Sequence, residues 1–394
     1  MLALRLARGS HPLVLLRRLF VASAAAGTGF LLLSTLGHAA GHPTAAGESL
    51  VRLLWCAAPL AATAQLAASV ARTDPAARLH RGMAAAGLGP LRITLLAAAS
   101  TALSCLLGTL LALLVFLRLR GDIGGSTSPT GGALGIDSAV LGAGHPVPFV
   151  GALMLLSAVP LTAVAATAVA LRPRSDSAVP QAEAEPAVKA AGPSGLPWGM
   201  AVTAAGVAIE AYASRGAGSQ GRPMTFSDRI IGSPPGVLGG WALSVLGLVL
   251  AGPGLVHLCG RLLCAGRPGA LRLLSGRVLQ RESRRLGRPL GVLCAVASGT
   301  YAAVKVYDAS SSRPFGPLTV IGAAVVLACV TASALAAALE SRSARAHTSA
   351  ALRRLGAPRS VLRRAAALRA LALVIVLGPL TWAVAEMATL PLLP

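Results

Sequence analysis

The sequence predicts an all-α fold, a polytopic transmembrane helix bundle of about nine spans in two pseudo-repeated halves. The first observation is composition: 55% of the 394 residues are hydrophobic and 12% are charged, with a mean hydropathy of +0.71. Soluble domains carry about a quarter charged residues. The second is a series of apolar runs of about twenty residues, the length that a helix needs to cross a bilayer. The third is the gathering of arginines between these runs.

The apolar runs divide the chain into four parts. Residues 1–171 form a first transmembrane half, and residues 172–196, with Pro180 and Pro186, form a polar cytoplasmic linker. Residues 197–258 make a two-span connector, and residues 259–394 make a second half of about three spans. The predicted spans lie near 17–37, 50–71, 93–117, 146–171, 197–214, 236–258, 289–306, 317–339 and 368–387.

The basic residues predict how the chain crosses the membrane. Lysine and arginine number 35 against 13 acidic residues, a net charge of +22. If the N-terminus is cytoplasmic, most of the basic residues fall in segments on the cytoplasmic side, as the positive-inside rule requires. Because they occupy short segments between spans, and form no soluble basic face, we expect the lipid bilayer as their surroundings and no nucleic-acid partner.

The segment Glu340 to Arg369 is the densest of these basic stretches, and it lies between two long apolar runs. An earlier stretch, Arg72 to Arg92, has the same position between spans and a similar glycine-containing turn. The repeated layout is the reason for predicting two related halves. The residues that we expect to form the two segments are Arg78, Arg81, Gly87, Gly89, Pro90 and Arg92 in the first, and Arg345, Arg353, Arg354, Leu355, Gly356, Ala357, Pro358 and Arg359 in the second.

The stretch Leu352-Arg353-Arg354-Leu355-Gly356-Ala357-Pro358-Arg359 resembles the cytoplasmic segment of FtsX-like ABC transporter permeases, the MacB-type superfamily. Ala86 to Arg92 is a looser copy, and Leu271 to Arg288 is similar to the basic lead-in that actinobacterial members place before their second half. The outer segments are short and rich in Gly, Ser and Pro, so the resemblance is to members without a large extracytoplasmic domain. It implies a permease subunit in a bacterial plasma membrane.

The same resemblance implies that an ABC-type ATPase subunit, supplied in trans, docks on both segments. The work that it drives would be export, or action at the outer leaflet, on a lipid, a peptide or an antibiotic-like substrate. The chain has no G-x-x-x-x-G-K-[ST] loop around either Lys189 or Lys305, so we expect no ATPase activity, no other enzyme activity and no cofactor of its own. The seven histidines have no metal-ligand spacing, and no metal site is predicted.

Two alternatives stay open. Each arginine could instead anchor a span to anionic lipid headgroups, an interaction of about 1 kcal/mol per residue. At the level of function, the chain could be a non-transporting membrane sensor or regulator, or a degenerate permease without an ATPase partner. A glutamate that the permease family often carries early in the span after the turn is absent, with Ser100 and Arg369 near the equivalent places.

Two carboxylates fall within predicted spans, where a charge is costly and therefore marks a candidate functional site. Glu210 is the candidate intramembrane polar site, and a loose pairing with Arg215 near the outer interface is its structural alternative. Glu386 lies close enough to a span end to be solvated, and Lys305 at the end of another span is expected to anchor at the membrane interface.

Overall fold

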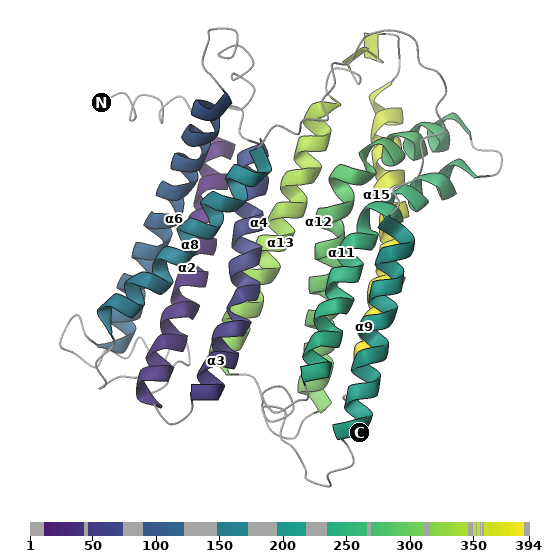
Figure 1. Cartoon of the computed structure of the whole chain (residues 1–394). Coiled ribbons are helices and arrows are strands. Elements are labelled where there is room, and N and C mark those ends of the chain that lie inside the picture. The colour runs from purple at the N-terminus through teal and green to yellow at the C-terminus, as the bar shows by residue number, and fades with distance from the viewer. Residues whose placement is uncertain are drawn as a thin grey trace. The chain divides into compact units, whose positions relative to one another are not determined.

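The structure is a computed structural model that describes residues 12–42, 46–73, 90–121, 148–171, 195–217, 235–265, 269–309, 316–345, 350–351, 353–354, 356 and 358–389. Every element within these ranges is an α-helix (Figure 1). The prediction of an all-α fold is therefore confirmed. The helices are α2 (Pro12–Gly41), α3 (Ala46–Trp55), α4 (Ala57–Thr73), α6 (Pro90–Arg120), α8 (Phe149–Leu171), α9 (Gly195–Ala217), α11 (Pro235–Cys264), α12 (Ala270–Ala309), α13 (Pro317–Ala344) and α15 (Arg359–Thr389).

Seven stretches of these helices are long and apolar enough to cross a membrane, which indicates a multi-pass membrane protein. Two further predicted spans, 197–214 and 289–306, lie in α9 and α12, which are helical but fall outside the seven. Glu210 lowers the hydropathy of α9, and Lys305 and Asp308 lower that of α12. The seven stretches are Leu15–Gly41, Arg52–Arg72, Ala98–Arg120, Phe149–Leu171, Gly239–Cys264, Leu318–Ser343 and Arg359–Thr389.

The chain divides into two compact units. Unit 1 comprises Met1–Pro180 with Phe315–Ser333, so its helices are α2, α3, α4, α6, α8 and the first part of α13. Unit 2 comprises Gln181–Pro314 with Ala334–Pro394, and it holds α9, α11, α12, the last part of α13 and α15. The α9–α11 pair, predicted as a connector, packs with α12 inside unit 2.

The core of unit 1 forms where α2, α6 and α8 meet. Phe30 of α2 and Phe116 of α6 pack edge to face, with ring centroids 6.5 Å apart. Such aromatic pairs contribute beyond the area that they bury. Leu33 of α2 and Leu156 of α8 complete the centre of the cluster, and Ile321 of α13 packs against it. Large side chains therefore fill the space between the helices of this unit.

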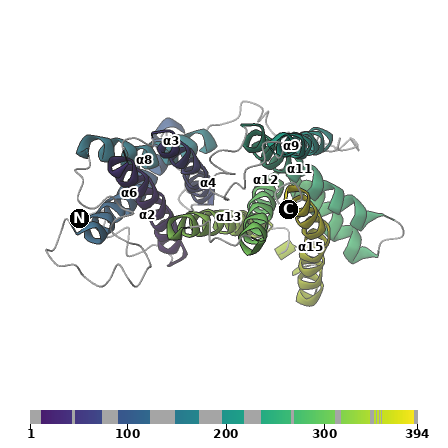
Figure 2. The same cartoon turned by 90° about the horizontal axis from the view of Figure 1, so that it is seen from below.

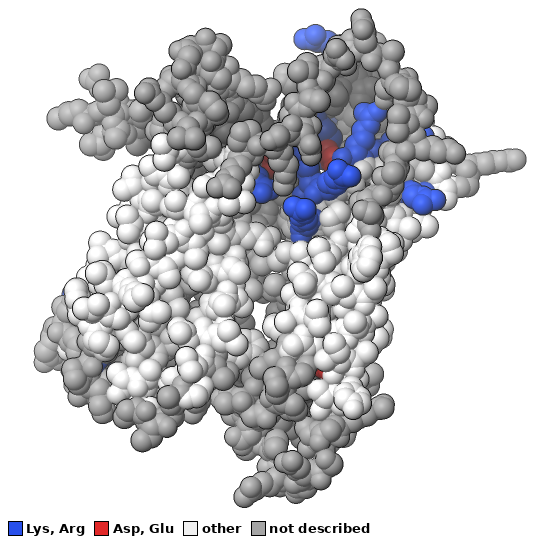
Figure 3. Space-filling view, in the orientation of Figure 1, with Lys and Arg blue, Asp and Glu red and all other residues white. Residues whose placement is uncertain are grey.

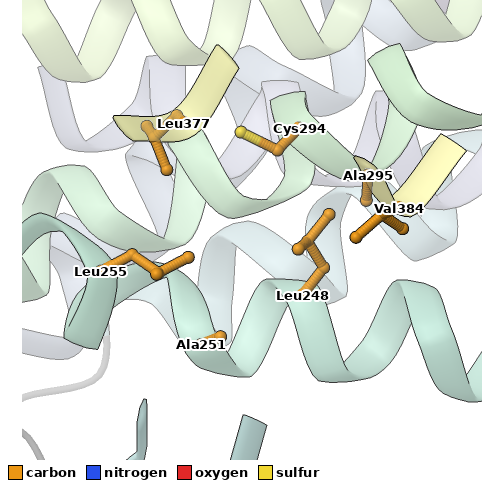
Figure 4. Close-up of a cluster of buried hydrophobic side chains, with 7 residues drawn as sticks. All are labelled: Leu248, Ala251, Leu255, Cys294, Ala295, Leu377 and Val384. Atoms are coloured by element: carbon orange, nitrogen blue, oxygen red, sulfur yellow. The ribbon is translucent and has the colours of Figure 1, made fainter. Parts of the chain in front are cut away.

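In unit 2, α11 lies between α9 and α12 (Figure 2). The pairs run antiparallel: Gly206 of α9 faces Ser244 of α11, and Gly199 faces Ala251, while Gly252 of α11 faces Gly287 of α12. Small residues at these positions allow backbones to approach closely, which is the usual basis of helix association in lipid. The side chains of α11, α12 and α15 meet in a second cluster, shown in Figure 4, of Leu248, Ala251, Leu255, Cys294, Ala295, Leu377 and Val384.

Candidate functional site

The first half of α12 has two distinct faces. Ser275, Leu279, Ser283 and Gly287 are buried and recur every fourth residue, so they share one side of the helix. The arginines of this stretch are all exposed, and most of them lie on the other side: Arg277, Arg281, Arg284, Arg285 and Arg288, with Arg272, three residues before Ser275, as the exception. The sequence pattern therefore builds a helix that packs into unit 2 along one face and presents guanidinium groups along the other.

The start of α15 extends this basic surface. Arg359, Arg363 and Arg364 are exposed, whereas Ala365 is buried. Immediately before α15, a helical turn at Arg353 and Arg354 ends at Gly356, whose φ of 92° suits glycine. The Gly356 amide donates to the Arg353 carbonyl oxygen over 3.1 Å. A tight turn thus separates the exposed pair Arg353 and Arg354 from the helix that follows.

A buried hydrogen bond joins α12 to α15 within this region. The Ser275 hydroxyl lies 3.2 Å from the Ala365 carbonyl oxygen and 2.7 Å from the Leu271 carbonyl oxygen of its own helix. Ser275 is fully buried. This contact joins the two helices at the point where both carry exposed arginines.

An ion pair links α12 to the end of α13. Arg345 Nε lies 2.9 Å from Glu282 Oε1. The same guanidinium donates to the carbonyl oxygen and the hydroxyl of Ser341, both over 2.9 Å. Burial raises the pKa of the Glu282 carboxyl, and the nearby charges of Arg345, Arg369 and Arg285 oppose that rise. One carboxylate therefore sits within a group of arginines contributed by three helices.

Together these contacts define the arginine-rich end of unit 2, which comprises residues 270–288 of α12, the end of α13 and residues 353–369. Figure 3 shows basic side chains gathered at this end, while most of the described surface elsewhere in this view is white. Of the predicted second segment, Arg345, Arg353, Arg354, Gly356, Pro358 and Arg359 lie here; Leu355 and Ala357 lie outside the described residues.

The first predicted segment falls largely outside the described residues. This holds for Arg78, Arg81, Gly87 and Gly89. Pro90 is the first residue of α6, a position that suits proline because no intrahelical donor is needed there. The side chain of Arg92 is not among those described. The proposed equivalence of the two segments consequently remains a prediction.

Sequence reasoning assigned the arginines of α12 only to a lead-in, and it missed their contact with α15 and α13. The signal was present in the spacing of Ser275, Leu279, Ser283 and Gly287 every fourth residue. That pattern marks a packed face on a stretch that is otherwise rich in arginine. It does not say which helix covers the face.

Glu210 lies away from this end, on the face of α9 that packs against α11. Its side chain is 2% exposed, and Oε2 has no hydrogen-bond partner within the described part of the chain. The predicted partner, Arg215, lies in α9, but its side chain is not among those described.

The sequence predicted that Glu386 would be solvated near a span end. In the structure it also has a charged partner. It forms an ion pair with Lys305, whose Nζ lies 2.7 Å from both carboxylate oxygens, and it accepts a hydrogen bond of 3.1 Å from the Tyr301 hydroxyl. The pair joins the C-terminal ends of α12 and α15, whereas the arginine-rich end comprises the N-terminal parts of these two helices. Opposite charges at two span ends were the available signal, but only the packing brings them together.

The described residues contain no group of three or more His, Cys, Asp or Glu side chains that could hold a metal ion. All six cysteines are free thiols, five of them buried among apolar helices. Comparison of the chain with known protein families, with curated proteins and with solved structures finds no match.

Proposed function

We propose that this chain is the permease subunit of an ABC-type transporter, an integral membrane protein that depends on an ATPase supplied as a separate subunit. The observation that carries the proposal is the arginine-rich end of unit 2. There, exposed arginines lie on the first half of α12 and at the start of α15, which is long and apolar enough to cross a membrane (Figure 3). Such a basic helical surface suits a cytoplasmic protein groove with acidic and apolar character.

The contacts inside this end suit the transmission of force. Ser275 bonds α12 to the Ala365 backbone of α15, and Glu282 bonds α12 to Arg345 after α13. A partner that pulls on the exposed arginines would move α12, α13 and α15 together, because these two contacts connect the three helices. ATP binding by the partner would thereby tilt the apolar helices, and the output would be work on a lipid, peptide or antibiotic-like substrate at the outer leaflet.

The positive-inside rule supports the orientation of this proposal. The arginine-rich end is the most basic part of the described chain, so it belongs on the cytoplasmic side, together with the N-terminus. In that orientation the docking surface faces the compartment that contains ATP. The membrane is the bacterial plasma membrane, and the ATPase subunit and the bilayer are the partners.

The test is purification in mild detergent from the native host, with mass spectrometry of co-purifying proteins and an ATPase assay on the eluate. We expect a stoichiometric ATP-binding subunit. Replacing Arg353, Arg354 and Arg359 together by alanine should release it. A clean preparation without an ATPase, under conditions in which a known permease retains its own, would refute the proposal and favour a sensor, a regulator or a degenerate permease.

A matched variant separates docking from lipid anchoring. Lysine at the same three positions keeps the positive charge that anionic headgroups attract. It lacks the planar guanidinium group, which forms bidentate hydrogen bonds with carboxylates. We expect the lysine variant to insert normally and to bind the ATPase subunit less tightly. If it binds as tightly as the wild type, the arginines act only as positive charges at the membrane face.

A further inference from the structure

Glu210 is a buried carboxyl group that the proposed function does not use. It lies in α9, 2% exposed, with Oε2 lacking a hydrogen-bond partner in the described structure. A carboxylate without compensation is among the most unfavourable groups to bury, and neutralisation by a proton is the usual resolution. The surroundings of this side chain decide whether anything else could compensate the charge.

The face of α9 that carries Glu210 is a seam of small residues. Gly199, Thr203 and Gly206 precede Glu210 at intervals of four and three residues, which places all four on one side of the helix. A Cβ added to Gly240 of α11 would lie 2.7 Å from the Glu210 backbone nitrogen and 3.0 Å from its Cβ. The backbones of α9 and α11 are therefore in close contact at Glu210.

The hydroxyl groups of the seam are engaged elsewhere. Thr203 donates to the Gly199 carbonyl oxygen over 2.8 Å, and Ser244 of α11 donates to the Gly240 carbonyl oxygen over 3.0 Å. Each hydroxyl thus spends its single proton within its own helix. Neither hydroxyl therefore donates to Glu210, and Oε2 has no donor among the described residues.

Among the described side chains of the neighbouring elements, none pairs with Glu210, and the Arg215 side chain is not among those described. The helices packed against α9 are α11 and α15. The ionisable groups of α11, such as His257 and Arg261, follow Gly254, which packs against Leu196 near the start of α9. On α15, Glu386 is paired with Lys305 of α12. On α9 itself Tyr212 is exposed, as is Asp308 at the end of α12.

We infer that Glu210 is a proton-binding site that keeps α9 packed against α11. The neutral acid fits the seam, and loss of the proton would leave a buried charge that separates the two helices. The site lies opposite Gly240, close to the start of α11, whereas Cys264 at the other end of α11 contacts Gly276 in the arginine-rich end. Protons would reach it from the side of the membrane opposite that end. This inference does not depend on the proposed permease function.

Infrared spectroscopy of the purified protein tests the site directly. The carbonyl stretching band of a protonated carboxylic acid should persist well above pH 4.3, about where a solvated glutamate ionises. Glu210→Gln should lose this band, and Glu386→Gln, the matched control, should keep it. Glu210→Asp should keep a band at a shifted frequency, so the assignment survives if one of the two Glu210 variants fails to fold.

Hydrogen–deuterium exchange of α9 peptides tests the consequence in the wild-type protein. Because the packed state holds the proton, stability of the seam falls as pH rises, and exchange corrected for intrinsic pH effects should become faster. Glu210→Gln should show no such rise. The inference is overturned if the wild-type spectrum has no protonated band above that pH, if Glu210→Gln leaves the band in place, or if exchange in α9 is independent of pH.

Discussion

Unit 1 packs α2, α6 and α8 around large side chains, whereas unit 2 packs α9, α11 and α12 backbone against backbone. Phe30, Leu33 and Phe116 fill the centre of unit 1, two of them with 2% exposure or less. In unit 2, a Cβ on Gly252 or Gly287 would meet the backbone of the facing helix. Among the described glycines of unit 1, Gly108 of α6 makes a comparable approach, against the Ala22 carbonyl oxygen of α2.

The difference shows two ways to hold helices together where burial from water is not the driving force. In lipid, helix association depends on van der Waals packing and on hydrogen bonds. Large interlocking side chains supply many contacts but leave a cavity when one is removed. Glycine seams supply close backbone contact but have no space for an added atom. The two units should therefore respond in opposite ways to changes in side-chain volume.

The largest effect is expected from adding volume to the seam of unit 2. In Gly252→Val the new Cβ would collide with the Gly287 carbonyl oxygen and approach Gly291 Cα to 3.1 Å. Because the obstacle is backbone, neither helix can yield locally, and we expect a loss of about 3 kcal/mol or more. The free energy of unfolding in mixed detergent micelles measures it.

Two glycine variants serve as controls for this prediction. A Cβ at Gly239, also in α11, meets no heavy atom within 4 Å, so Gly239→Val should be close to neutral. At Gly27 in unit 1 a Cβ would lie 2.6 Å from Val325 Cγ2, a side chain that can change rotamer, so Gly27→Ala should be tolerated. Equal losses in all three variants would mean that close backbone approach is not what distinguishes unit 2.

The next effect is expected from removing volume in unit 1. Phe116 is 2% exposed and packs edge to face with Phe30. In lipid the transfer contribution is small, so the cavity dominates the cost of Phe116→Ala, about 2 kcal/mol for a void on the order of 100 Å³. The same unfolding assay measures it. A loss no larger than that of Gly239→Val would show that the aromatic pair does not support the unit.

Removing one or the other partner of the Glu282–Arg345 ion pair should cost different amounts of stability. Arg345→Met leaves Glu282, with a side chain 14% exposed, without its partner, and we expect a loss of about 2 kcal/mol. Glu282→Gln leaves Arg345 bonded to Ser341, so the loss should stay below about 1 kcal/mol. Equal losses for the two variants would contradict this account.

The smallest effect is expected at the opposite end of unit 2. The side chains of Lys305 and Glu386 are 38% and 28% exposed, so water and salt screen their attraction. Glu386→Gln should lower the thermal midpoint slightly at low ionic strength and leave it unchanged at high ionic strength. A large decrease that persists in high salt would place this pair with the buried contacts of the unit.

The described helices were predictable because hydropathy and length are properties of consecutive residues. The apolar runs of α2, α6, α8 and α13 contain almost no charge between their ends, so no other element satisfies their backbone in lipid. The α9 and α12 helices were harder to classify because Glu210, Lys305 and the arginines of α12 disturb that signal. In both helices the polar residues occupy positions that only packing could explain.

The sequence predicted most of the residues of the candidate site, because arginine is concentrated in two segments. It predicted only part of how these residues are arranged in space. The arginines from Arg353 to Arg364 stand out in the chain, as do those of α12. Their union into one surface rests on Ser275 bonding Ala365 and on Glu282 bonding Arg345, contacts between residues 90 and 63 positions apart in the chain. No local pattern specifies such partners, since many serines and arginines in the chain could have formed them.

Local chemistry was thus sufficient to predict helices, their apolar character and the segments in which charge accumulates, because each depends on neighbouring residues alone. The pairing of faces depends on all the helices at once. Gly206 and Gly240 allow close approach anywhere, but they bury Glu210 only because α9 and α11 run antiparallel in one register. That register follows from fitting complementary surfaces together, and this fit buries the Glu210 carboxyl group, whose Oε2 has no hydrogen-bond partner among the described residues.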